Sequence, residues 1–296
     1  MIRNVLITGD THGRVTQRIL NIARNYPDLV PEETAIIILG DAGINFYLNK
    51  SDKKNKYQIN KYGYKVYCVR GNHEEHPGNI DSMEYVFDED VGYWVYWEED
   101  YPNIRYLADG FIYNFKGYRC LVIGGAYSVD KWWRLQQAAA QGSSFSGWFE
   151  DEQLTPEEME NIFERIKNEN VDFVFTHTCP SIYEPKDLFL SCVDQSTVDK
   201  SMEYWLNDVK NSVNWKIWCF GHFHADRVEY PCVEQFYYQY EEIDKIYNRW
   251  YNEKTISQEY KELELSPSAE LWSKIKFENA KFEIIDFEEG NDEDKA

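Results

Sequence analysis

Short apolar runs that end in glycine and polar residues recur along the chain, and their spacing predicts an α/β fold. The first three runs and the turn residues that follow them are 4–8 before Gly9-Asp10, 35–39 before Gly40-Asp41, and 66–69 before Arg70-Gly71-Asn72-His73. Continuous apolar runs of this kind predict strands that are buried on both faces of a sheet. Between the first two runs, apolar residues recur at helical spacing over 14–26, which predicts a βαβ unit.

Later segments predict a hairpin and a capped helix. Residues 111–115 and 118–123, joined across Lys116-Gly117, have the pattern of a β-hairpin. Thr155-Pro156-Glu157-Glu158 is typical of a helix start, and we expect this helix to run to about residue 168. The polar, lysine-rich stretch 50–61 is expected to be a surface excursion.

The C-terminal part of the sequence has a different character. Residues 236–263 are rich in Tyr, Glu and Lys and have helical character, residues 281–287 predict a last strand, and residues 288–296 form an acidic tail that we expect to be disordered. No repeat or linker divides the chain. We therefore expect a single domain over 1–287, with the helical segment at about 236–263 as an insertion.

Charge and hydropathy limit the partners. The 296 residues include 52 Asp+Glu and 31 Lys+Arg, and the formal net charge of −21 argues against broad nucleic-acid binding and against anionic lipid surfaces. No run approaches the ~20 consecutive apolar residues of a membrane-spanning helix, so no membrane partner is expected. With 43% hydrophobic and 17% aromatic residues, the chain can bury a substantial core. The sequence leaves the oligomeric state open.

The start of the chain and the cysteines predict a cytoplasmic location. Residues 1–10 lead directly into the first strand pattern, without the charged and apolar regions of a signal peptide. The six cysteines are scattered and include no CxxC pair. At this chain length we expect free thiols rather than disulfides.

Histidines and carboxylates collect where the predicted strands end. The apolar runs 171–176 and 215–220 predict two more strands, each followed by histidine. The side chains at the five strand ends are Asp10, His12, Asp41, Asn72, His73, His177, His222 and His224. Because the carboxyl ends of strands in an α/β sheet converge on one crevice, we expect a single site.

The residue types in this set favour a two-metal site. Two aspartates, an asparagine and four histidines supply oxygen and nitrogen ligands that suit Mn, Fe, Zn or Co better than Ca²⁺ or a thiolate zinc site. Seven such side chains exceed what one tetrahedral ion takes. With one bridging carboxylate they make two four-ligand sites, with ions roughly 3.5–4 Å apart.

The order of the motifs resembles that of the calcineurin-like metallophosphoesterases, with bacterial and phage character. The segments that carry the resemblance are Gly9-Asp10-Thr11-His12-Gly13, Gly40-Asp41, Gly71-Asn72-His73-Glu74, Thr176-His177 and Gly221-His222-Phe223-His224. Together they cover most of the chain up to about residue 225. The resemblance implies an α/β fold in which a β-sandwich is flanked by helices (α-β-β-α), with a dinuclear metal site at the C-terminal ends of the strands.

The resemblance also implies roles for these residues. One metal would be held by Asp10, His12 and His224, the other by Asn72, His177 and His222, and Asp41 would bridge them. His73 would be the general acid above the leaving group and help to bind phosphate, while a water or hydroxide held between the metals attacks phosphorus in line. Glu74 is expected to anchor a loop, and His76 to lie in a surface loop.

Two further segments bear on the substrate. The Ser/Thr protein phosphatases of this family continue the second motif with an Asp and an Arg that are missing from Gly40-Asp41-Ala42-Gly43-Ile44-Asn45-Phe46, which argues against that class. Residues 124–134 resemble a segment near the active site of bacterial and phage members. The candidates for substrate contact are Arg70, Tyr127, Lys131, Trp132, Trp133 and Arg134. A structural role for Arg70 and core packing of the tryptophans are the alternatives.

We therefore expect a cytoplasmic hydrolase, a dinuclear metal-dependent phosphatase that acts on a small or flexible phosphomonoester. Its cofactors would be two transition metal ions per chain, of Mn, Fe or Zn. The first alternative is a nucleotide or nucleic-acid phosphodiesterase. The second is a non-catalytic scaffold that keeps the metallophosphoesterase fold.

Overall fold

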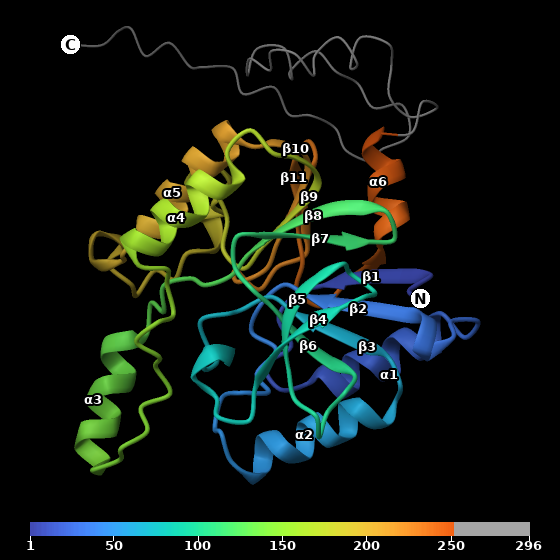
Figure 1. The fold of residues 1–296 in the computed structure, drawn as a ribbon. Helices are drawn as coiled ribbons and strands as arrows, with labels where there is room; N and C mark the ends of the chain where they lie inside the picture. Colours follow the sequence, from blue (N-terminus) through green and yellow to red (C-terminus); the bar gives the residue numbers. More distant parts are fainter. Residues whose placement is uncertain (252–296) are drawn as a thin grey trace, which may run out of the picture. The chain divides into compact units, whose positions relative to one another are not determined.

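Two mixed β-sheets face each other in the computed structural model, which describes residues 1–251 (Figure 1). Residues Met1–Ile243 form one compact unit, and a second unit begins at Asp244. Within the described residues, the first sheet has the order β13-β1-β2-β3-β6-β5-β4, and β1, β2, β3 and β6 run parallel. Its strands are β1 (Asn4–Thr8), β2 (Thr34–Ile38), β3 (Lys65–Cys68), β4 (Glu84–Asp88), β5 (Tyr93–Trp97), β6 (Ile104–Leu107) and β13 (Tyr240–Glu242).

The second sheet has the order β11-β12-β10-β9-β8-β7. Here β8, β9, β10 and β12 run parallel, whereas β7 and β11 are antiparallel to their neighbours at the two edges. The strands are β7 (Phe111–Phe115), β8 (Tyr118–Ile123), β9 (Asn170–Thr176), β10 (Asn214–Phe220), β11 (Arg227–Tyr230) and β12 (Val233–Gln235). The parallel central strands of both sheets deliver their carboxyl ends to a common edge, as the site below shows.

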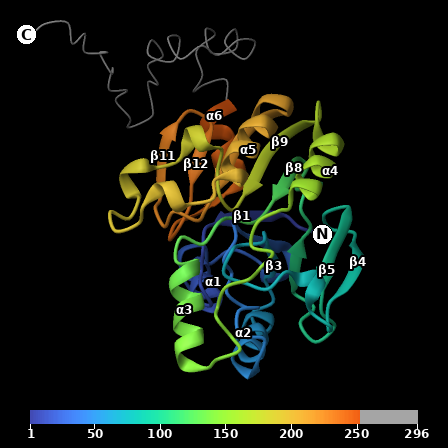
Figure 2. The ribbon, with the colours of Figure 1, turned by 90° about the vertical axis from the view of Figure 1, so that its left-hand side faces the viewer.

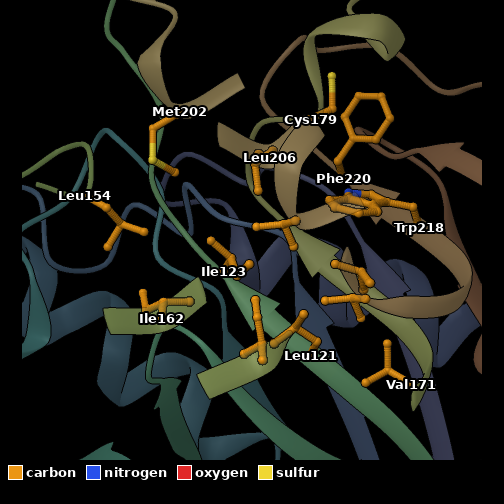
Figure 3. Close-up of a cluster of buried hydrophobic side chains, with 14 of the residues drawn as sticks. Leu121, Ile123, Leu154, Ile162, Val171, Cys179, Met202, Leu206, Trp218 and Phe220 are labelled. Carbon is orange, nitrogen blue, oxygen red and sulfur yellow. The ribbon is translucent and has the colours of Figure 1, made fainter. Parts of the chain in front are cut away.

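Helices cover the outer faces of the two sheets. α1 (Val15–Asn25) and α2 (Lys50–Lys61) lie against the first sheet, and α4 (Pro156–Ile166) and α5 (Ser201–Ser212) lie against the second (Figures 1 and 2). Between the second sheet and its helices, Leu121 and Trp218 pack with Leu206 in a fully buried apolar cluster (Figure 3). The four layers therefore follow the order α-β-β-α.

The space between the sheets is filled by aromatic and β-branched side chains. Tyr67 of β3 and Phe115 of β7 are fully buried, and their ring centroids are 5.1 Å apart, which joins the facing sheets. Along β2, Ile36 and Ile38 belong to the cluster under α1 and α2, whereas Ile37 points to the opposite face. Burial on both faces explains why these strands read as continuous apolar runs.

Two helices remain. α3 (Lys131–Gln141) projects from the sheets and has no buried residue (Figures 1 and 2), and α6 spans Ile243–Tyr251. Short 3-10 turns occur at Pro31–Glu33, Pro77–Asn79, Ser181–Tyr183, Lys186–Leu188 and Gln195–Thr197. No helix in residues 1–251 is long and apolar enough to cross a membrane.

Most of the predicted elements are confirmed. The strand at 4–8 and both strands of the hairpin across Lys116-Gly117 have the predicted bounds. The helix begun by Thr155 has the predicted capping box, in which the Thr155 hydroxyl accepts from the Glu158 backbone N–H, and it ends at Ile166. The α/β sandwich flanked by helices is confirmed as the fold class.

The surface excursion predicted for 50–61 is wrong, because these residues form α2. The Asn49 side chain caps the helix by accepting from the Ser51 backbone N–H. The buried face of α2 includes charged residues, since the Lys56 ammonium pairs with Glu98 and lies over the ring of Tyr101. A buried stripe of this composition gives no hydrophobic period in the sequence.

The C-terminal predictions are only partly covered by the described residues. Of the helical segment expected at 236–263, the structure describes residues up to 251, which include β13 and α6. The rest of that segment, the strand expected at 281–287 and the acidic tail at 288–296 lie outside the described residues. The single domain over 1–287 stays a prediction.

Candidate active site

The candidate ligands meet where strands of both sheets end. Asp10 and His12 follow β1, Asp41 follows β2, Asn72 follows β3, His177 follows β9, and His222 and His224 follow β10. One hydrogen bond joins strand ends of the two sheets, since the His222 backbone N–H donates to Asp10 Oδ1 (3.0 Å). Another joins the ends of the neighbouring strands β3 and β2, since the His73 N–H donates to Asp41 Oδ1 (2.9 Å). The predicted convergence on one site is therefore seen in the structure.

Several of these residues have a strained backbone. His12, Asp41, His222 and His224 have φ values of 44°, 49°, 65° and 53°, in the left-handed region that side chains with a Cβ rarely occupy. Strain of this kind persists where the surrounding structure imposes it, and it concentrates at functional sites. Here the left-handed backbone directs four donor side chains from tight loops toward the candidate site.

Two glycines allow the close approach of the loops. A Cβ on Gly40, whose φ is +89°, would lie 2.0 Å from His177 Nδ1. A Cβ on Gly71 would lie 2.0 Å from Asp41 Oδ1. Both distances are far inside van der Waals contact, so a side chain at either position would displace a candidate ligand.

A first donor cluster contains Asp10, His12 and His224. The two imidazoles face each other with Nε2 atoms 2.9 Å apart, and Asp10 Oδ2 lies 3.3 Å from His224 Nε2 and 3.8 Å from His12 Nε2. Asp10 is buried, and its Oδ2 has no hydrogen-bond partner. The histidine side chains are 34% and 49% exposed, so this cluster opens to solvent.

A second cluster contains Asn72, His177 and His222. Asn72 Oδ1 lies 2.8 Å from His177 Nε2 and 3.2 Å from His222 Nδ1. Asp41 lies between the clusters, with Oδ1 3.6 Å from His177 Nε2 and Oδ2 3.9 Å from His12 Nδ1. Asn72, His177 and His222 thus lie together, and Asp41 lies between them and His12.

The lone pairs in these clusters point at one another, which suits a cation between them. His177 Nδ1 lies 2.8 Å from the carbonyl oxygen of Leu39, which can only accept, so the ring proton of a neutral His177 is on Nδ1. The lone pair of Nε2 then faces Asn72 Oδ1, which is itself an acceptor. Oxygen and nitrogen donors of this kind fit Mn, Fe or Zn.

Electrostatics favour the deprotonated forms that bind metal. Burial acts to raise the pKa of Asp41, but the histidines around it, with His177 first, outweigh burial and hold that pKa well below its usual range. Burial, assisted by His177, holds the pKa of His222 well below its usual value. The site therefore presents a carboxylate and a neutral imidazole at neutral pH.

Comparison with known proteins agrees with the metal site that these donor residues indicate. The profile of the calcineurin-like phosphoesterases matches residues 3–226. The chain belongs to the calcineurin-like phosphoesterase family. Its members are dinuclear metal-dependent hydrolases of phosphoric esters, and this calcineurin-like phosphoesterase is therefore a metal-dependent hydrolase.

Solved structures and curated sequences add little to the family assignment. The crystal structure of TT1561 of Thermus thermophilus aligns at 11% identity, covering 82% of this chain and 98% of its own, with a TM-score of 0.40. A second crystal structure aligns at 13% identity, covering 83% of this chain and 96% of its own, with a TM-score of 0.39. No curated protein matches the chain.

His73 lies beside the first cluster of this phosphoesterase and has a free ring nitrogen. Its ring centroid is 5.8 Å from that of His12, and its buried Nδ1 has no hydrogen-bond partner. Burial lowers the pKa of His73, and Arg134 lowers it further, while Asp41 raises it. Next to it, Glu74 is buried and accepts from the Gly71 backbone N–H, in line with the expected loop anchor.

The structure favours the structural alternative for Arg70. The side chain is 5% exposed, and its guanidinium pairs with Asp109 through Nε at 2.9 Å. Its terminal nitrogens donate to the carbonyl oxygens of Asp151, Glu152 and Gly124. With four of its five N–H donors bound to protein groups, the buried Arg70 joins the loops after β3, β6 and β8.

The other substrate candidates surround the start of α3. Trp132 and Trp133 are each 61% exposed, so they are not in the core. The Lys131 ammonium lies 4.1 Å from the ring centroid of Trp148, 5.5 Å from that of Trp132 and 5.9 Å from that of the buried Tyr127. Arg134 pairs with Asp130 and donates to the carbonyl oxygen of Gly147.

Ser128 lies in the same segment and is not among the candidates that the sequence indicates. Asn72 Nδ2 donates to Ser128 Oγ at 2.8 Å, and Ser128 is 2% exposed. The signal available in the sequence was the pair Gly124-Gly125, which brings the backbone after β8 close to the site. That signal indicates proximity, but it does not say which side chain of the segment turns inward.

Proposed function

We propose that this phosphoesterase is a phosphatase that hydrolyses a small or flexible phosphomonoester with the help of two transition metal ions. The observation that carries the proposal is the meeting of two donor clusters, with Asp41 between them and His73 at their side. Two ions and the guanidinium of Arg134 suit a substrate group that carries two negative charges.

The proposed ligands divide as the two clusters do. One ion would be held by Asp10, His12 and His224 and the other by Asn72, His177 and His222, and Asp41 would be shared between them. When bound, the ions neutralise phosphate oxygens and lower the pKa of water. We propose Mn, Fe or Zn, because mixed carboxylate, amide and imidazole donors suit these metals.

His73 is proposed as the general acid. Its lowered pKa does not prevent this role, because a dianionic phosphate raises the pKa of a neighbouring imidazole. The His73 ring lies beside that of His12, with ring centroids 5.8 Å apart. The protonated imidazole of His73 would pass a proton to the oxygen of the leaving alcohol.

The segment at the start of α3 is proposed to bind the rest of the substrate. The exposed Trp132 and Trp133 offer faces for an aryl or heterocyclic group, and Lys131 with Tyr127 provides a positive charge held by aromatic rings. Arg134 is proposed to contact the phosphate. Arg70 is left out of this set because its side chain is buried and four of its five N–H donors are bound to protein groups.

A cytoplasmic location is proposed as well. All six cysteines lie in the described residues, and none of them is in a disulfide. Thiols persist in the reducing interior of the cell.

The direct test compares an aryl phosphate monoester with its bis-aryl diester, using Mn²⁺-reconstituted protein. We expect kcat/KM to be at least about tenfold higher for the monoester, because only a monoester dianion uses both ions and Arg134 fully. Preference for the diester would instead support the nucleotide or nucleic-acid phosphodiesterase. Absence of hydrolysis of either ester would contradict the proposal.

The role of His73 is tested with leaving groups of different basicity. His73→Ala should lower kcat by about 10²–10⁴ for an alkyl phosphate, which needs protonation, and by less for an aryl phosphate, which does not. The matched control is His76→Ala, because His76 is a nearby histidine that accepts from the Gly78 backbone N–H and packs on Tyr96. An equal loss for both esters would show that His73 binds phosphate without acting as an acid.

A further inference from the structure

Ser128 contacts a proposed metal ligand, and it has no role in the function proposed above. The hydroxyl Oγ of Ser128 accepts a hydrogen bond from Asn72 Nδ2 at 2.8 Å, and the two residues are 2% and 1% exposed. The other end of the same amide, Oδ1, faces His177 Nε2 and His222 Nδ1. The contact therefore determines which end of the Asn72 amide points into the second cluster.

This orientation is unfavourable without a constraint. His177 directs its Nδ1 at the Leu39 carbonyl oxygen, so the lone pair of Nε2 meets the Oδ1 of Asn72, acceptor against acceptor. A half-turn of the amide would replace this contact with an N–H donor facing a lone pair. It would also remove the metal ligand, because an amide nitrogen has no lone pair to offer a cation.

Ser128 opposes that half-turn because its own proton is committed elsewhere. Burial raises the pKa of the Glu152 carboxyl group, which is 2% exposed, and hydrogen bonding from the Ser128 side chain lowers that pKa, so this carboxyl group is an acceptor for the Ser128 proton. The Ser128 oxygen is then left as an acceptor and selects the N–H end of Asn72. In a buried site this selection is strong, because turning the amide would break the bond from Asn72 Nδ2 and place two acceptor oxygens, Asn72 Oδ1 and Ser128 Oγ, against each other.

We propose that Ser128 is a positioning residue that holds the amide oxygen of Asn72 toward the metal before the metal binds. It acts through Asn72 and touches neither substrate nor ion. The inference rests on the proposed function, since it assumes that Asn72 is a ligand. Partners of this kind orient ligands and tune metal affinity.

The test titrates metal-free protein with Mn²⁺ and measures affinity by calorimetry, with no substrate present. We expect Ser128→Ala to weaken binding of one ion by about ten- to hundredfold. Ser128→Cys provides a second variant if the first does not fold, because a thiol is a poorer acceptor. The control is Thr34→Val, which removes a fully buried hydroxyl that also accepts from an asparagine, Asn4, and should change affinity by less than about twofold.

A second background isolates the orientation of the amide. In Asn72→Asp protein both ends of the side chain are oxygens, so adding Ser128→Ala should weaken Mn²⁺ binding by no more than about twofold. Wild-type affinity in Ser128→Ala, or an equal loss in both backgrounds, would overturn the inference alone. Failure of the wild-type protein to bind Mn²⁺ would overturn the ligand set and the proposed function with it.

Discussion

At the residue scale, the site is built at positions where the backbone is under strain. Four proposed ligands, His12, Asp41, His222 and His224, have left-handed backbone conformations. For residues with a Cβ this costs about 1–2 kcal/mol each, which packing elsewhere must offset. The result is that donors from remote segments face one another across distances of about 3–4 Å.

Gly40 gives a test at this scale. Gly40→Ala should destabilise the metal-free protein by roughly 3 kcal/mol, because the new methyl group overlaps His177 and φ is positive. It should also weaken Mn²⁺ binding by displacing the imidazole. Denaturant unfolding and metal titration measure the two effects.

Gly117 is the matched control for backbone strain alone. Its φ of +93° is close to that of Gly40, but no atom lies within 4 Å of its added Cβ. Gly117→Ala should cost only about 1–2 kcal/mol and leave Mn²⁺ affinity unchanged. Equal effects of the two substitutions on metal affinity would contradict the close-approach explanation.

At the element scale, α3 differs from the other α-helices in residues 1–251 in that it contributes no buried residue to a hydrophobic core. None of its residues is buried, and Trp132 and Trp133 lie on its exposed first turn. Exposed aromatic side chains contribute little to the stability of a fold. We therefore explain the exposure of Trp132 and Trp133 by the substrate binding proposed above.

This explanation predicts a separation of stability from substrate binding. Trp132→Ala and Trp133→Ala should leave the Tm almost unchanged but raise KM for an aryl phosphate, by about fivefold or more for the one that stacks, with kcat unchanged. Tyr57→Ala on α2 is the control, since Tyr57 is also 61% exposed. If neither tryptophan variant alters KM, α3 has no part in substrate binding.

The elements that could be predicted from the sequence are those whose residues are buried in a regular way. β1 and β2 are buried almost throughout and stand out as apolar runs. The hairpin β4–β5 was missed because β4 is an edge strand with mostly exposed residues, including Tyr85 and Phe87. α2 was missed because charged residues are part of its buried face. The pattern of hydrophobic and polar residues predicts an element only where its buried positions are apolar and its exposed positions are polar.

The candidate site could likewise be predicted only in part. Strand ends that carry Asp and His indicate a metal centre, because parallel strands must bring those ends together. The roles of Arg70 and Ser128 depend on where single side chains turn after the chain leaves a strand. That direction is set by partners such as Asp109 and Asn72, which are distant in sequence.

At the scale of the whole molecule, a protein with a net charge of −21 also buries acidic groups. Glu203 of α5 is 5% exposed, and burial raises its pKa to about 7. The hydroxyl of Thr178 donates to it, Glu184 raises the pKa, and Lys200 lowers it. The folded state thus keeps a proton that the unfolded state loses near its ordinary pKa of 4.5.

The sign of the pH dependence follows from this difference. Because the folded state binds more protons between about pH 4.5 and 7, the contribution of Glu203 to stability falls as pH rises through that window, and the penalty is complete above it. Glu203→Gln keeps the acceptor for Thr178 and removes the charge. It should stabilise the protein at pH 8 by on the order of 1–3 kcal/mol, and by much less at about pH 5.

Denaturant unfolding of metal-free protein at the two pH values measures this change. The control is Glu160→Gln, because Glu160 is exposed on α4. It should leave the pH dependence as it is in the wild type. A Glu203→Gln variant with wild-type pH dependence would show that Glu203 ionises normally in the folded protein.

The central claim is that seven side chains from the two sheets hold a pair of metal ions. The most direct measurement is the metal content of the protein after incubation with Mn²⁺ at neutral pH and removal of free ions. The account predicts about two ions per chain in the wild type and a clear loss in Asp41→Asn, which weakens the bridge. A wild-type protein that retains less than about one ion per chain would contradict it.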